Sequence, residues 1–106
     1  MAFLDEAQHG FLTTTVTYDG AQSAAILVAA TSGKAIIVDK VMYSADAQGT
    51  MFLASDSTQK SHTIYYGANG GVAVDDWRLV CGVGENLKIT TTDSGNHSIF
   101  VRYYLV

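Results

Sequence analysis

Short runs of β-branched and aromatic residues, separated by glycine-containing turns, are the feature that most limits how this chain can fold. Val, Ile and Thr supply 27 of the 106 residues, and their side chains favour the pleated surface of a sheet. The breaks are turn sequences such as Asp19-Gly20, Asn69-Gly70 and Ser94-Gly95, which provide the positive φ angles that hairpins need. Strands spaced about 8–12 residues apart without intervening helices predict an all-β protein, an antiparallel sandwich or barrel.

Seven to eight short strands can be predicted within a single domain, which is the domain count that 106 residues favour. We expect a β-sandwich domain over residues 13–106, preceded by residues 1–12 as an N-terminal arm or first strand. The predicted strands are Phe11–Tyr18, Ala24–Ala30, Ala35–Ser44, Thr50–Ser55, His62–Tyr66, Val72–Val74 together with Leu79–Cys81, Leu87–Thr92, and Ser98–Val106.

The last of these strands is apolar on both faces, whereas a strand with one face in water alternates apolar with polar residues. One face carries Ile99, Val101, Tyr103 and Leu105, and the other carries Phe100, Arg102, Tyr104 and Val106. A small sandwich has one core and can bury only one of these faces. We therefore predict that Phe100, Arg102, Tyr104 and Val106 contact another subunit. The alternative is that they lie half-exposed on a monomer, as tyrosines often do on sheets.

The chain contains no proline, although it has many turns. Proline is one of the residues that prevent an exposed edge strand from pairing with another chain. The edges of the predicted sheets must therefore be paired, covered or bulged.

Charged residues make up only 15% of the chain, against 48% hydrophobic residues. Such low charge over a high apolar content predicts extensive contact with other subunits. The six Lys and Arg against ten Asp and Glu give a net charge of −4. This balance argues against direct nucleic-acid binding, which requires clustered basic side chains.

Neither a secretion signal nor a membrane span is expected. The first basic side chain is Lys34, and the longest apolar run, Ala24–Ala30, is seven residues where a spanning helix needs about twenty. The single cysteine, Cys81, cannot form an intrachain disulfide and is expected to be a small buried residue. The chain is thus expected to fold in a reducing cytoplasm.

No residue pattern predicts catalysis, a metal site or a cofactor. His9, His62 and His97 lack the spacing of zinc ligands. Asp75 and Asp76, beside Trp77, are adjacent residues that would point to opposite faces of a strand and so could not flank one glycosidic bond. We expect no enzyme activity.

The second half of the chain resembles a family of virus proteins. Its features are Thr31-Ser32-Gly33-Lys34 before a strand, the turn over Gly67–Gly71, the segment Gly82-Val83-Gly84-Glu85-Asn86-Leu87, and the ending Val101-Arg102-Tyr103-Tyr104. This order of turns and strands is similar to that of the small β-sandwich head decoration (cement) proteins of tailed bacteriophages. The resemblance covers residues 31–106.

The resemblance implies a jelly-roll-like domain, often a homotrimer, that is made in the host cytoplasm and stabilises the phage head by binding between major capsid subunits on the capsid surface. In that setting the apolar residues Phe3, Leu4, Phe11 and Leu12 are candidate capsid contacts. Alternatively, this segment is the first strand of the chain's own sandwich.

A second function is also compatible with the sequence: a carbohydrate-binding β-sandwich module of a phage tail or surface protein. Such modules stack sugars on exposed aromatic rings. A row of coplanar exposed rings would favour sugar binding, whereas a compact oligomer with buried rings would favour the capsid role.

Overall fold

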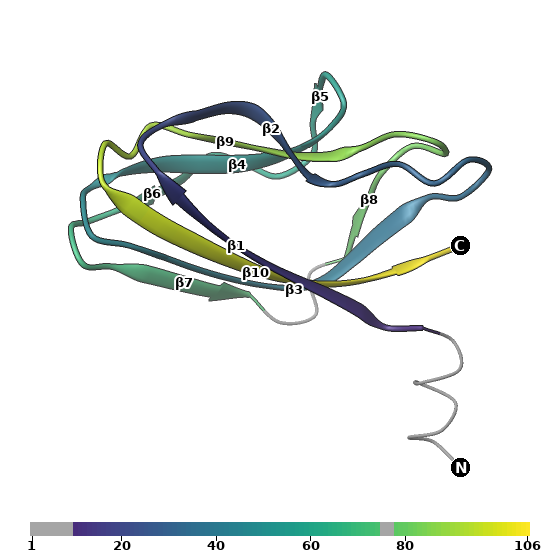
Figure 1. Ribbon diagram of the computed structural model, residues 1–106, viewed down its shortest axis with the longest axis horizontal. Coiled ribbons are helices and arrows are strands. Elements are labelled where there is room, and N and C mark those ends of the chain that lie inside the picture. The colour runs from purple at the N-terminus through teal and green to yellow at the C-terminus, as the bar shows by residue number, and fades with distance from the viewer. Residues whose placement is uncertain (1–9, 75–77) are drawn as a thin grey trace, which may run out of the picture.

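The computed structural model describes residues 10–74 and 78–106, and every regular element in them is a β-strand (Figure 1). The strands are β1 (Leu12–Asp19), β2 (Gln22–Val28), β3 (Ile36–Ala45), β4 (Gly49–Ser55), β5 (Thr58–Gln59), β6 (Ile64–Tyr66), β7 (Gly71–Val74), β8 (Leu79–Val80), β9 (Leu87–Thr91) and β10 (Asn96–Leu105).

These strands form two antiparallel sheets, which lie over one another as two layers (Figure 1). The first sheet has the order β1-β10-β3-β7, and β8 also pairs with β3. The second has the order β2-β9-β4-β5, and β6 also pairs with β4. Each sheet thus has one edge that is divided into two short strands. If each divided edge counts as one position, the order is that of an eight-stranded jelly roll.

The all-β antiparallel sandwich predicted from the sequence is confirmed. The strand count differs because the expected strand Val72–Val74 with Leu79–Cys81 is two separate strands, β7 and β8, and because the two-residue β5 was not predicted. Such short strands lack a long hydrophobic pattern that would reveal them in the sequence.

The core lies between the two sheets and is filled by alternate residues of the central strands. Val38 and Val41 of β3, Ile99 and Val101 of β10, and Leu53 of β4 are each 1% exposed or less. Burial of this kind contributes about 1.5–3 kcal/mol for each large aliphatic side chain. The period-two alternation in these strands therefore determines which face of each sheet turns inward.

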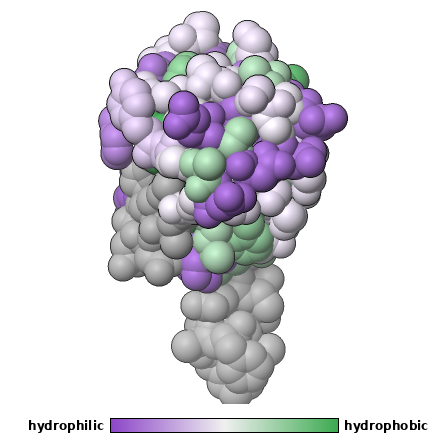
Figure 2. Space-filling model, turned by 90° about the vertical axis from the view of Figure 1, so that its left-hand side faces the viewer, coloured by the Kyte–Doolittle hydropathy of each residue, from purple (hydrophilic) through white to green (hydrophobic). Residues whose placement is uncertain are grey.

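The turns at one end of the sandwich are tied together by backbone hydrogen bonds. The N–H of Gly20 donates to the carbonyl of Gly95 (3.0 Å), and the N–H of Asp46 donates to the carbonyl of Asn96 (3.0 Å). Gly20 has a φ of 87°, which favours glycine. A Cβ at Gly95 would collide with the carboxylate of Asp46. Seen from this end, the surface mixes hydrophilic residues with small hydrophobic areas (Figure 2).

A buried polar chain lies beneath these turns. The Tyr66 hydroxyl donates to Oδ2 of Asp93 (3.3 Å), which leaves the Tyr43 hydroxyl to donate to Tyr66 (2.9 Å). The other oxygen of Asp93 accepts the N–H of Gly95 (2.7 Å). Burial, followed by the hydrogen bond to Tyr66 and the nearby charge of Asp93, holds the pKa of Tyr43 well above its usual range.

This pKa shift predicts that stability falls in alkali. Tyr43 in the unfolded chain loses its proton near pH 10, whereas the buried hydroxyl keeps it. Above pH 10 the unfolded state binds fewer protons, so the free energy of unfolding should decrease by about 1.4 kcal/mol per pH unit from this one group. Tyr43→Phe should remove that part of the slope in urea denaturation between pH 8 and pH 11.5.

The matched control is Tyr65→Phe, since Tyr65 is 79% exposed and lies on β6 next to Tyr66. This variant keeps Tyr43, so the alkaline loss assigned to Tyr43 should remain. Identical slopes for all three proteins would contradict the assignment of the alkaline loss to Tyr43.

Candidate interaction surface

The side of the β1-β10-β3-β7 sheet that faces away from the core is here called the outer face. It contains the residues of the last strand that were predicted to contact another subunit. Ile99 and Val101 of β10 point inward and are 1% and 0% exposed. Phe100, Arg102 and Tyr104 alternate with them and are half-buried, and Val106 is 58% exposed. The strand therefore has the two faces that its alternating sequence predicts. Contact of the outward residues with another subunit remains a prediction.

Two rows of side chains cross the middle of the outer face without any charge. Strand pairing places Thr15 of β1, Phe100 of β10 and Met42 of β3 in one row. It places Thr17, Ser98 and Ser44 in the next. Since Met42 is 46% exposed and Phe100 is half-buried, the centre of this face presents apolar surface between hydroxyl groups.

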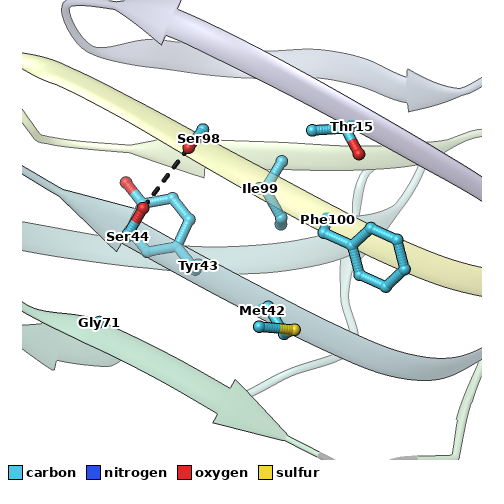
Figure 3. Close-up of a pocket in the computed structure, with 8 residues that line it drawn as sticks. All are labelled: Thr15, Met42, Tyr43, Ser44, Gly71, Ser98, Ile99 and Phe100. Carbon is cyan, nitrogen blue, oxygen red and sulfur yellow. Dashed lines mark hydrogen bonds between the residues drawn. The ribbon is translucent and has the colours of Figure 1, made fainter.

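An open hollow of about 480 Å³ lies over these rows (Figure 3). The hydroxyls of Ser44 and Ser98 are 3.4 Å apart across the two central strands, and Phe100 lies on the same strand as Ser98, beyond Ile99. The hollow is lined by Thr15, Met42, Tyr43, Ser44, Gly71, Ser98, Ile99 and Phe100. It is open to solvent and does not form an enclosed cavity.

A second, more polar hollow of about 340 Å³ adjoins the first and shares Ser44 and Ser98 with it. Asp46, Asn69 and Asn96 supply its polar lining. The outer face therefore changes from apolar at Phe100 to polar at the turns.

A β-bulge places an ion pair at the other end of the outer face. The pairing of β10 with β3 shifts between Arg102 and Tyr103, so that Asp39 and Lys40 both stand opposite Arg102. Nε of Arg102 donates to Oδ2 of Asp39 (2.6 Å), and a second guanidinium nitrogen forms an ion pair with the same oxygen. Because the Arg102 side chain is 42% exposed, we assign this pair less than about 1 kcal/mol of stability and a mainly orienting role.

Arg102 also connects a predicted capsid contact with the predicted subunit contacts, which lie at opposite ends of the sequence. Its guanidinium carbon lies 5.0 Å from the centre of the Phe11 ring. Phe11 in turn meets Tyr104 edge-on, with ring centres 5.6 Å apart and planes at 83°. Phe11, predicted as a capsid contact, and Arg102 and Tyr104, predicted as subunit contacts, thus form one continuous patch.

The remaining predicted contact residues do not lie together. Leu12 begins β1 and is 41% exposed. Val106 follows β10, and its N–H donates to the carbonyl of Ala35 (3.0 Å). Phe3 and Leu4 lie outside the described residues.

Sequence reasoning missed the part of this surface that β1 and β3 supply. Met42 and Ser44 alternate with the buried Val41 and Tyr43, which is a readable signal for an outward position. What could not be read is that β3 lies next to β10, because the two strands are more than fifty residues apart in the chain.

The titratable side chains do not assemble into a reactive centre in the part of the chain that the structure describes. No group of three or more His, Cys, Asp or Glu side chains there could hold a metal ion. His97 is buried, with one ring nitrogen 3.1 Å from the Thr91 hydroxyl and the other 3.2 Å from the carbonyl of Gly95. His62 is exposed. His9 and the Asp75-Asp76-Trp77 segment lie outside the described residues.

Cys81 is 2% exposed and belongs to the core, as expected. Burial raises the pKa of its thiol, which keeps it protonated. Within residues 10–74 and 78–106, no helix is long and apolar enough to cross a lipid bilayer.

Among the described residues, the rings of Phe11, Tyr104 and Tyr65 do not form a coplanar row. Phe11 and Tyr104 are nearly perpendicular, and Tyr65 lies on the other sheet.

The two faces of β10 should lose different amounts of stability when a charge is introduced. Val101→Lys buries an unpaired ammonium and should lower the free energy of unfolding by more than about 3 kcal/mol. Phe100→Lys, one residue earlier, can extend its ammonium into water and should lower it by less than about 1.5 kcal/mol. Urea denaturation of both variants checks this, and equal losses would contradict the face assignment.

No protein-family profile matches the chain, and no curated protein sequence matches it. Among solved structures, the chain is similar to the nucleoplasmin-like N-terminal domain of Drosophila FKBP39, with 12% identity, a TM-score of 0.51 and 89% of each chain covered. It is similar to a Bacillus endospore appendage pilus protein, with 17% identity, a TM-score of 0.45, and 92% of this chain and 88% of that one covered. It is also similar to the virus-like particle protein of the extra small virus of the prawn Macrobrachium rosenbergii, with 17% identity, a TM-score of 0.39, and 91% and 78% covered. At these identities the first likeness supports the β-sandwich fold alone.

Proposed function

We propose that this protein is a structural virion protein that decorates the head of a tailed bacteriophage and stabilises it by binding between major capsid subunits. The observation that carries the proposal is the outer face, whose central rows around Phe100 and Met42 carry no charge. A cement protein acts through broad contact with a lattice and needs such a surface in place of an enclosed pocket.

The composition of the outer face fits a protein interface. The buried centres of interfaces are depleted in charged residues and enriched in aromatic residues, Met and Arg. Phe100, Met42 and Tyr104 supply the first two kinds, and Arg102 supplies the third. The hydrogen bond from Arg102 to Asp39 holds the guanidinium before any partner arrives, so less side-chain freedom is lost on binding.

The charge of the chain is consistent with a position on the outside of the shell. With ten acidic and six basic residues, the protein has little attraction for the packaged DNA. Its proposed partners are therefore the major capsid protein and further copies of itself. The homotrimer is the assembly that the resemblance implies, and neither nucleic acid nor membrane takes part. Synthesis in the host cytoplasm follows from the same role.

The first twelve residues are proposed to contribute to capsid binding. Phe11 and Leu12 are 38% and 41% exposed, and Phe11 extends the patch formed by Arg102 and Tyr104. Phe3 and Leu4 are two further apolar residues among the first twelve.

The test is binding to shells assembled from the major capsid protein of the same genome. The protein should sediment with the shells, saturate at a fixed ratio, and add density at repeating positions in cryo-electron microscopy. Phe100→Lys should weaken binding at least about a hundredfold, because interface energy concentrates in a few central residues.

The matched control is Phe52→Lys, because Phe52 is also a half-buried phenylalanine on a central strand but lies on the second sheet. It should bind as the unsubstituted protein does. Failure to sediment with shells would overturn the proposed function, and equal effects of the two variants would overturn the assignment to the outer face. Deletion of Met1–Gln8 tests the arm separately, since unchanged binding would exclude a role for it.

A further inference from the structure

The four sheet edges of the sandwich differ in how well they are protected from pairing with another chain. Edge strands are normally kept from pairing by shortness, bulges, charged side chains or proline. The edge of the first sheet made by β7 and β8 consists of strands of four and two residues. The edge of the second sheet made by β5 and β6 consists of strands of two and three residues. Both are protected by their shortness.

The third edge, β2, is protected by irregularity. Its pairing with β9 shifts between Gln22 and Ala25 and again between Ile26 and Val28. Ala24, inside the strand, has a φ of 49°, which a non-glycine residue rarely adopts. A strand with two such interruptions cannot offer a regular ladder to a partner.

The fourth edge, β1, has none of these protections. It is eight residues long, and its register with β10 runs without a shift from Leu12 to Asp19. Between these two residues stand only Thr, Val and Tyr, with neither proline nor charge. Within the described residues, only β10 pairs with β1, so its other side presents unpaired backbone groups.

We propose that β1 pairs antiparallel with β1 of a second copy across a two-fold axis, joining the two first sheets into one. This contact goes beyond the proposed function and does not rest on it. It leaves Phe100 and Met42 exposed on the joined outer faces, since both lie on strands further from the edge.

The alternation of β1 limits the register of this pair. Residues directly opposite one another share a face of a sheet. Thr13, Thr15 and Thr17 lie outward, whereas Val16 and Tyr18 pack against the core. Outward threonines must therefore face outward threonines. Among such registers, the two that pair the longest part of β1 place Thr15 opposite Thr15 of the second copy or opposite its Thr17.

Charge complementarity favours a second copy as the occupant. In the second register Asp19 of one copy stands opposite Thr13 of the other, whose neighbour on β10 is Arg102. In the first register it stands opposite Phe11, whose ring centre is 5.0 Å from the Arg102 guanidinium carbon. The two-fold axis creates this opposite-charge approach twice, and no like charges face each other along the edge. Asp19 at one end of β1, and Arg102 on β10 beside the other end, make the edge complementary to itself.

Cysteine cross-linking tests the geometry. Thr15→Cys places two thiols opposite each other in the first register, and Thr15→Cys with Thr17→Cys does so in the second, at a separation that a disulfide can bridge. Thr13→Cys is the matched control on the same face of the same strand, because its counterpart would lie about 13 Å away along the strand in the first register and about 20 Å away in the second. The native Cys81 is buried and should not contribute.

Under mild oxidation, we expect a covalent dimer from Thr15→Cys or from the double variant, and none from Thr13→Cys. The absence of a dimer from both of the first two, or an equal yield from Thr13→Cys, would overturn the proposal.

Charge substitution tests the contact without a covalent bond. Thr15→Lys brings two like charges together at the axis and should raise the dissociation constant about a hundredfold, halving the mass of the assembly in analytical ultracentrifugation. Mixing Thr15→Lys with Thr15→Glu should restore the original mass. Thr90→Lys, on the second sheet, is the control and should not change the mass. An unchanged mass for Thr15→Lys, or a monomeric unsubstituted protein, would overturn the proposal and leave the capsid-binding test unaffected.

Discussion

The pairing of β3 with β10 is the interaction on which the rest of the structure depends. The two ten-residue strands form the centre of the first sheet, with a ladder that runs from Ala45–His97 to Ile36–Leu105. This ladder turns Val38, Val41, Ile99 and Val101 into the core. Both outer neighbours of the pair, β1 and β7, depend on it for their positions.

The same ladder creates the outer face as a by-product of core packing. Once Val41 and Val101 point inward, Met42 and Phe100 must point outward and stand next to each other. The single bulge at Asp39 then allows a carboxylate to reach Arg102 without interrupting the sheet. The uncharged centre of the outer face and the oriented Arg102 beside it therefore follow from the register of β3 with β10 and from the one additional residue, Asp39, in the bulge.

The protection of the edges connects this architecture with assembly. In a chain without proline, shortness and bulges protect the edges formed by β5 to β8 and by β2. Only β1 remains long and regular, and it borders the outer face. The uncharged rows around Phe100 and Met42 and the open edge therefore occur on the same sheet, which makes this sheet the side of the molecule where contact with other subunits is to be sought.

Much of the fold could be predicted from the sequence because its causes are local. Alternation identified the inward and outward residues of Ser98–Val106, and the glycine turns separated strands within a few residues of their observed ends. The burial of Cys81 followed from its apolar neighbours. The proximity of Phe11 to Arg102, the position of Met42 beside Phe100, and the division of the edges into β5, β6, β7 and β8 could not be predicted. Local pattern determines which side chains of a strand share a face, whereas the neighbour of each strand depends on long-range pairing that only the packed sandwich decides.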